Sequence, residues 1–284
     1  MSWAFARRAE LPALRGLLCE REWECASLTG RLLAGGKYAL PASGSARLAL
    51  RGENGRPRQV LYMTKSGLVI PYFPGLPAAD AREAQAARGI FRSAWGKLSI
   101  LVGLKTYVQT FTAWLGMDPL VSVDYYLMAS AGFPQELPRA GAFPLEIRRA
   151  KAADLPAILP LQEAYEKEEI LFRDEDYSAS KTRSELKLNL KTQLVYLGFY
   201  AGRLIAKGAT NARGFTCDQI GGVYTLPDFR GRGIARLLMR RLLWHIFADG
   251  KTACLFVKKH NLPALRLYGG LGFRIAENYR ISYF

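Results

Sequence analysis

The stretch LPDFRGRGIARLLMRRLL, residues Leu226–Leu243, places a proline, two glycines and several arginines at the front of a helical pattern. Its apolar residues Ile234, Leu237, Leu238 and Leu242 recur at helical spacing, and the preceding sequence DQIGGVYTLP is typical of a strand. A helix that starts after a glycine turn offers unpaired amides and a partial positive charge to an anion. The alternative is a plain surface turn followed by a basic helix.

Known phosphate-binding patterns differ in how well they fit this turn. A Walker A loop is excluded because no Lys-Ser or Lys-Thr pair follows the glycines. A dinucleotide loop is matched by Gly231 and Gly233, but Arg236 stands where that pattern needs a third small residue. The pattern Arg/Gln-x-x-Gly-x-Gly/Ala is met in full by Arg230, Gly233 and Ala235.

A second motif follows at Asn261, Ala264, Tyr268, Gly272 and Phe273, with the spacing Asn-x-x-Ala-x-x-x-Tyr-x-x-x-Gly-Phe. With both motifs in this order, residues 145–284 resemble the GNAT superfamily of acyl-CoA-dependent N-acyltransferases. The whole chain further resembles tandem GNAT proteins whose N-terminal half is degenerate. Residues 1–143 contain no second Arg-x-x-Gly-x-Gly/Ala loop, so we expect no second cofactor site there.

The fold expected is α/β, with two GNAT-like domains that each hold a central mixed β-sheet flanked by helices. A Pro- and Gly-rich stretch, residues 132–144, predicts the boundary between a domain 1–143 and a catalytic domain 144–284. The second domain is predicted to run β-α-α-β-β-β-α-β-α and to close with one or two strands, its first helix spanning 152–170 and capped by Asp154. In the first, strands are predicted in 46–52, 58–74 and 98–103, and helices in 78–97 and 105–116.

The resemblance implies that acetyl-CoA or another acyl-CoA lies along the strand Val223, Tyr224 and Thr225. It also implies that the pyrophosphate meets the amides of Gly231, Arg232, Gly233, Ile234 and Ala235, beside Arg230. Asn261 would touch the cofactor or serve only as a helix cap. Arg232, Arg236 and Arg240 share a helix face, which either reaches the adenosine 3′-phosphate, with Arg232 nearest the loop, or is a solvated basic stripe.

The resemblance gives Tyr268 the role of protonating the leaving thiolate, and a core tyrosine is the alternative. Glu168 and Glu169, with Glu166 in the run EKEEI, are candidates for a general base, for binding a cationic acceptor, or for a solvated face. Asp218 is a second base candidate. Lys207 lies within a strand, where it either meets an acidic group or faces solvent.

The formal net charge of +16 is spread over both halves of the chain and favours anionic partners. Three alternative functions stay open: a nucleic-acid-associated protein, an acetyltransferase that acts on tRNA or on a ribosomal protein, and a CoA-binding regulator without catalytic activity. Against the first, the basic residues form no single tract and no nucleic-acid motif occurs. The acceptor expected is a small-molecule or peptide amine, and the protein is expected to be a monomeric pseudo-dimer or a homodimer.

The sequence favours a cytoplasmic protein with no metal site and no membrane partner. Its four cysteines form no C-x-x-C pair and no signal peptide is recognised, so free thiols are expected. The apolar stretch LSILVGL is too short to span a bilayer. His245 and His260 are the sole histidines, which excludes a His-rich metal centre.

Overall fold

A computed structural model describes residues 3–33, 36–42, 44–53, 55–75, 81–130, 132 and 144–284. The chain forms two compact units. Unit 1 comprises Met1–Met128, Phe256–Leu262 and Ile275–Phe284, and unit 2 comprises Ala129–Leu255 and Pro263–Arg274. The domain boundary predicted at residue 143 falls in 133–143, outside the described residues.

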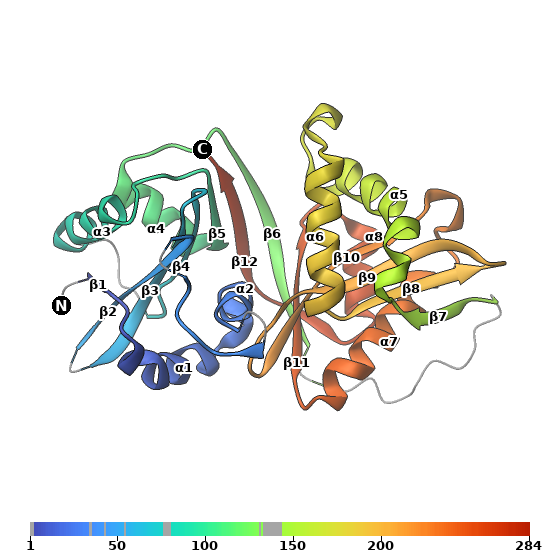
Figure 1. The fold of residues 1–284 in the computed structure, drawn as a ribbon, viewed down its shortest axis with the longest axis horizontal. Coiled ribbons are helices and arrows are strands. Elements are labelled where there is room, and N and C mark those ends of the chain that lie inside the picture. Colours follow the sequence, from blue (N-terminus) through green and yellow to red (C-terminus); the bar gives the residue numbers. More distant parts are fainter. Residues whose placement is uncertain are drawn as a thin grey trace. The chain divides into compact units, whose positions relative to one another are not determined.

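Unit 2 contains most of the second half of the chain, including the glycine turn, and is drawn from light green to orange-red in Figure 1. Its elements follow the order predicted from the sequence up to the closing strand. They are β7 (Glu146–Arg149), α5 (Leu155–Tyr165), α6 (Ala179–Thr192), β8 (Val195–Tyr200), β9 (Arg203–Arg213), β10 (Cys217–Thr225), α7 (Ile234–Ala248), β11 (Thr252–Lys258) and α8 (Leu262–Gly269).

The sheet of unit 2 has the strand order β11-β10-β9-β8-β7. All neighbours are antiparallel except β10 and β11, which run parallel. Successive residues of β9 show how its two faces are covered, because side chains alternate along a strand. Lys207 points to the Tyr165 ring of α5, while a Cβ at Gly208 would meet Leu238 of α7. Helices α5 and α7 therefore cover opposite faces.

Apolar side chains fill both layers of unit 2. Between α5, α6 and the sheet, a cluster of buried residues consists of Leu155, Ile158, Leu186, Val195 and Leu197. On the other face, α7 buries Ile234, Leu238, Met239, Leu242, Leu243 and Ile246. This packing holds the start of α7, where the glycine motif lies, against the sheet.

Unit 1 is built from the other half of the chain, in blue to green in Figure 1, and from the last strand. Its sheet has the order β1-β2-β3-β4-β5-β12-β6, with β4 and β5 parallel. The elements are β1 (Trp3–Phe5), α1 (Leu11–Glu20), α2 (Glu22–Leu32), β2 (Ala46–Glu53), β3 (Arg56–Thr64), β4 (Leu68–Tyr72), α3 (Ala81–Ser93), β5 (Ile100–Leu104), α4 (Lys105–Leu115), β6 (Val121–Ser130) and β12 (Phe273–Tyr283).

Strand β12 pairs antiparallel with β5, from Tyr279 opposite Leu104 to Tyr283 opposite Ile100. β12 also contacts β6, because Arg280 of β12 forms an ion pair with Asp124 of β6 at 2.6 Å. The strand that closes the second half of the sequence is thus part of the sheet of unit 1.

The two halves of the chain repeat one order of elements. β1-α1-α2-β2-β3-β4-α3-β5-α4-β6 corresponds element by element to β7-α5-α6-β8-β9-β10-α7-β11-α8-β12. In each half, antiparallel neighbours are followed by one parallel pair, β4 with β5 and β10 with β11. The predicted mixed α/β class is confirmed, and the order of elements supports an internal duplication that identities along the sequence do not reveal.

The first helix of unit 2 differs from the prediction in two respects. The α-helix ends at Tyr165, and Glu166–Ile170 forms a π-helical turn, so the acidic run leaves the α-helical path. Asp154 makes no side-chain cap to α5. Its carboxylate instead accepts from the backbone amide of Lys151 and, through both oxygens, from Arg148, each at 2.7–2.8 Å.

Candidate functional site

The glycine turn between β10 and α7 has the backbone that its sequence requires. Gly231 and Gly233 have φ of +76° and +75°, and, apart from the two chain neighbours, no residue has a heavy atom within 4 Å of where a Cβ would stand on either one. Only glycine adopts such angles without strain. Open space at both positions keeps the main chain accessible from outside.

Amides at the start of α7 line this open turn. The loop bonds that close it are donated earlier, by Phe229 to Leu226 and by Arg230 to Pro227. Among the described residues, Gly231, Gly233, Ile234 and Ala235 donate no backbone hydrogen bond in the loop. These unpaired donors at a helix N-terminus give the turn the electrostatics of an anion site.

Strand β10 leaves its parallel neighbour before it reaches the turn. The pairing of β10 with β11 covers Cys217–Ile220 and Thr252–Leu255 only. On its other side, pairing with β9 shifts register between Gly221 and Tyr224, and Gly222 has φ of +61°. This β-bulge and the end of pairing leave the backbone around Val223 as a strand edge able to accept an extended ligand.

Glu168 connects the π-helical turn to the glycine loop. Its Oε2 accepts from Arg230 Nη2 at 2.7 Å and from the Tyr224 hydroxyl at 2.8 Å. Arg230 also donates from Nε to the Thr225 carbonyl at 3.0 Å. The first arginine of the motif therefore fixes the end of β10 to the acidic run predicted from the sequence.

Lys207 lies on the face of the sheet that α5 covers, and its side chain is buried, with the residue only 4% exposed. Its Nζ donates to the Gly222 carbonyl at 2.9 Å and stands 4.2 Å from the centre of the Tyr165 ring. Tyr165 in turn meets Tyr224 edge-on, with 6.0 Å between ring centres. Of the two alternatives left open by the sequence, the solvent-facing one is wrong, because Lys207 points inward, where it contacts a ring and a carbonyl.

Tyr268, on α8, is partly buried and packs edge-on against Phe273, with 6.0 Å between ring centres. Burial, and after it the charge of Glu169, raises the pKa of its phenol above the ordinary value. A raised pKa keeps the phenol protonated at neutral pH, as a proton donor requires. The negative charge of Glu169 therefore acts on the phenol of Tyr268.

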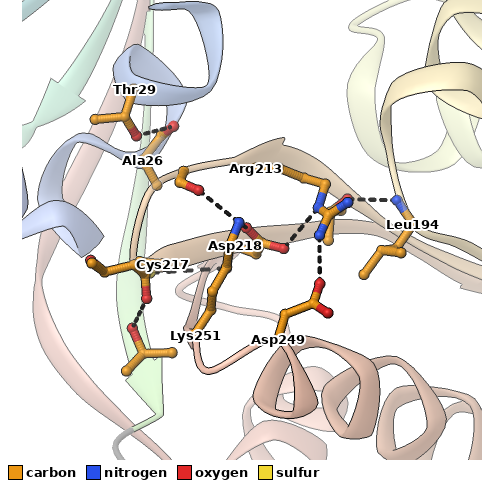
Figure 2. Close-up of polar contacts among 12 residues, drawn as sticks. Ala26, Thr29, Leu194, Arg213, Cys217, Asp218, Asp249 and Lys251 are labelled. Atoms are coloured by element: carbon orange, nitrogen blue, oxygen red, sulfur yellow. Dashed lines mark hydrogen bonds and ion pairs between the residues drawn. The ribbon is translucent and has the colours of Figure 1, made fainter. Parts of the chain in front are cut away.

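Asp218 occupies a different place from the one expected of a base. Its fully buried carboxylate lies between Lys251 Nζ at 2.9 Å and Arg213 Nε at 3.1 Å, and Arg213 continues to Asp249 at 2.7 Å (Figure 2). It stands at the start of β10, whereas the glycine loop follows the end of that strand. Each of its oxygens forms an ion pair with a basic side chain, so we expect Asp218 to stabilise the fold and not to act as a base.

The remaining residues singled out in the sequence lie at separate places in the fold. Arg232 stays at the loop, where Nη2 donates to the Asp228 carbonyl at 3.3 Å, whereas Arg236 donates to the Gly270 carbonyl at 3.2 Å and thereby supports the end of α8. Asn261 belongs to the residues of unit 1, and its amide donates to Lys258 at 3.0 Å. His245 contacts the Tyr196 hydroxyl through Nδ1 at 2.6 Å.

Among the residues that the structure describes, no group of three or more His, Cys, Asp or Glu side chains could hold a metal ion. In the same residues, no helix has the length and the apolar character needed to cross a membrane.

Comparison with known proteins agrees with this geometry. Residues 196–281, which include Lys207, the glycine loop and Tyr268, match the model of the family described as FR47-like protein. An X-ray structure of a Drosophila protein aligns over 99% of this chain and 98% of its own, with a TM-score of 0.72 and 14% identity. An acetyltransferase of the GNAT family from Colwellia psychrerythraea aligns over the whole of both chains, with a TM-score of 0.59 and 13% identity.

The chain has a GNAT fold. A tandem GNAT protein from the clavulanic acid biosynthesis pathway aligns over 98% of this chain and 96% of its own, with a TM-score of 0.57 and 12% identity. Alignments of this extent cover both halves, so the GNAT resemblance expected for residues 145–284 and the tandem GNAT arrangement expected for the whole chain are both confirmed. No curated protein matches the sequence.

The structure also brings to this face of the sheet two residues that the sequence left unassigned. Tyr165 and Gly222 carry no motif of their own, and their part in the site depends on the bulge in β10. A signal existed for Lys207, since a lysine between apolar residues of a strand is unusual unless it has a specific contact. The direction in which that side chain points was not available from the sequence.

Proposed function

We propose that the protein is an N-acetyltransferase that moves an acetyl group from acetyl-CoA to an amine. The observation that carries the proposal is the open glycine turn at the start of α7, which directly follows a bulged and partly unpaired strand. The GNAT fold and the acetyltransferase named among its structural relatives support it. Bound acetyl-CoA supplies an activated acyl group on a thiol leaving group.

The described residues fit such a cofactor. Space beside Gly231 and Gly233 lets a pyrophosphate approach the amides of Gly231–Ala235, where a side chain would exclude it. The strand edge at Val223, Tyr224 and Thr225 would hold the pantetheine arm by main-chain hydrogen bonds. Arg232 would add a positive charge at the loop, and Asn261 stays a proposed contact.

Tyr268 is assigned the role of the acid that gives its proton to the leaving thiolate. Its raised pKa means that it carries this proton across the neutral range. In this role only the hydroxyl of Tyr268 takes part in the reaction, because its ring packs against Phe273.

The π-helical turn is proposed as the acceptor side of the site, with its two candidate glutamates in different roles. Glu168 is committed to Arg230 and Tyr224, which suits a residue that fixes the loop. Glu169, near Tyr268, is assigned to attract the ammonium group of the acceptor. Exposed Ile170 and Phe172 next to it favour an acceptor with an apolar part, either a small molecule or a peptide.

All four cysteines are free thiols, which suits the proposed cytoplasmic location. Unit 1 is proposed to be the degenerate partner, and the catalytic residues belong to the second half of the sequence.

Thermal unfolding with and without acetyl-CoA tests the cofactor site. At a ligand concentration about 100 times Kd, binding adds about 2.7 kcal/mol and raises Tm. Gly233→Glu should abolish this rise, since a carboxylate would fill the anion site. Gly250→Glu is the matched control, because Gly250 also has a positive φ (+71°) and open space but lies after α7. A salt-sensitive rise with an oligonucleotide and none with acetyl-CoA would refute the proposal.

A further inference from the structure

Lys207 is a buried amine that no assigned role explains. Its Nζ contacts the Gly222 carbonyl at the bulge of β10, the point where the strand edge begins to open. A Cβ at Gly222 would lie 3.1 Å from this nitrogen, so glycine lets the amine and the bulge approach each other. The amine thus stands beside the strand proposed to hold the acyl-bearing arm.

The charged groups near Lys207 leave it without a counter-ion. Glu166 is the carboxylate that acts on it electrostatically, yet its two oxygens accept from Gln162 at 2.8 Å and Thr182 at 2.7 Å. In the described chain, Lys207 forms no ion pair. The titratable groups that face it are Tyr165 at the end of α5, Glu166 on the π-helical turn and Tyr224, which lies opposite Lys207 on β10.

A buried ammonium without a carboxylate partner is costly, whereas a neutral amine can still donate to a carbonyl. Burial accordingly lowers the pKa of Lys207 to about 7, and the charge of Glu166 opposes this only in part. At neutral pH a large fraction of Lys207 therefore carries a free electron pair. A group with this property accepts a proton efficiently near the working pH.

We propose that Lys207 is the base that takes a proton from the acceptor's ammonium group, directly or through one water. The inference rests on the proposed acetyltransferase function and deepens it. Glu169 attracts the cation, and Lys207 removes the proton that blocks its electron pair.

In the proposed reaction, every proton that leaves the acceptor is taken up by Lys207 or Tyr268. The ammonium N–H bond breaks, its proton goes to Lys207 Nζ, and the freed electron pair forms the C–N bond to the acyl carbon. As the C–S bond breaks, Tyr268 gives its proton to the sulfur, and the second proton leaving the nitrogen restores Tyr268. Lys207 then releases its proton to solvent. An ammonium and a thioester have become an amide, a thiol and one proton.

Variants of Lys207 separate this role from a structural one. Lys207→Arg keeps the charge and the donor but does not deprotonate, and Lys207→Met keeps the length of the side chain. Lys187→Arg on the exposed face of α6 is the control. Release of the CoA thiol is followed as a function of pH with glycine, spermidine, tobramycin and alanyl-lysine as acceptors, and acetyl-CoA binding is measured for each variant.

The wild type should lose kcat/KM as pH falls through about 7, the pKa of Lys207. Lys207→Arg should lose turnover on the order of 100-fold and lack this limb, with acetyl-CoA affinity unchanged. A variant that keeps the limb and turns over within about twofold of the wild type overturns the proposal, as does an acetyl group found on Lys207, which would make it a nucleophile.

One measurement on the unmodified protein keeps the proposal testable if both variants fail to fold. In protein labelled with 13C at lysine Cε, one resonance should titrate with a midpoint of about 7. If every lysine titrates near the ordinary value, the proposal is wrong. Absence of transfer to all four acceptors, with acetyl-CoA still bound, would instead refute the proposed function.

Discussion

Arg230 Nη2 donates to Glu168 Oε2 over 2.7 Å, which ties the first residue of the glycine motif to the π-helical turn. The two side chains are 45% and 40% exposed, so solvent screens the pair and its contribution to stability is small. We expect this ion pair mainly to fix the position of the glycine loop. The pair brings together in the fold an acidic run and a glycine motif that lie far apart in the sequence.

Glu168→Gln should weaken acetyl-CoA binding by a factor of a few and leave kcat nearly unchanged, because the loop is held less firmly while the chemistry is intact. The free energy of unfolding should change by less than about 1 kcal/mol. Calorimetric titration and steady-state kinetics measure the two effects. Glu163→Gln, which breaks the neighbouring exposed pair with Lys167, is the control. A hundredfold fall in kcat would instead favour Glu168 as the base.

Tyr268→Phe should lower kcat on the order of 100-fold, because the ring stays in place while the acidic proton is lost. Acetyl-CoA affinity should not change. Since the pKa of Tyr268 is raised by burial and by Glu169, its ionisation should cause no loss of rate below a pH of about 10. Tyr196→Phe, which removes a hydroxyl bonded to His245, is the control expected to keep its kcat. Equal turnover in Tyr268→Phe and the wild type would remove Tyr268 from the mechanism.

Lys207 should make stability depend on pH. Its pKa falls from 10.5 to about 7 on folding, so between these values the unfolded chain binds a proton that the folded chain does not. Stability contributed by this site therefore rises with pH across that window, at no more than about 1.4 kcal/mol per unit.

Relative to Lys207→Met, the wild type should accordingly be less stable near pH 7 and recover as the pH approaches 10.5. Urea unfolding of both proteins at several pH values measures the difference. A difference that does not vary with pH would mean that Lys207 keeps its charge in the folded protein.

Asp218→Asn should destabilise the protein by about 3 kcal/mol, because Lys251 and Arg213 lose the buried carboxylate between them. Asp249→Asn, at an exposed end of the same network, should cost less than about 1 kcal/mol. Denaturant titration compares the two. Activity per folded molecule should survive in both variants, and its specific loss in Asp218→Asn would return Asp218 to the candidates for the base.

Much of the fold could be predicted from the sequence where local patterns and long-range packing agree. The helix from Ile234 and the strands around it follow regular apolar spacing, and their order was predicted correctly. In unit 1, β1, α1, α2 and β6 were not assigned. Helix α2 buries Glu22 and Glu24 and is irregular at Cys25, so it lacks the polar and apolar faces that reveal a helix.

The site could be predicted only as far as backbone motifs define it. Gly231 and Gly233 are informative because a positive φ demands glycine, and the structure gives both that conformation. The inward direction of Lys207 and the pairing of Glu168 with Arg230 depend on a bulge and a π-helical turn. Neither irregularity has a residue pattern that sets it apart from a regular strand or helix.

Transfer of a labelled acetyl group from acetyl-CoA to glycine, spermidine, tobramycin or alanyl-lysine tests the central claim most directly. The account predicts an acetylated amine and one equivalent of free CoA thiol with the wild type and with Gly250→Glu, and neither product with Gly233→Glu. Equal product with Gly233→Glu, or labelled acetate in place of an acetylated amine with every acceptor, would contradict it.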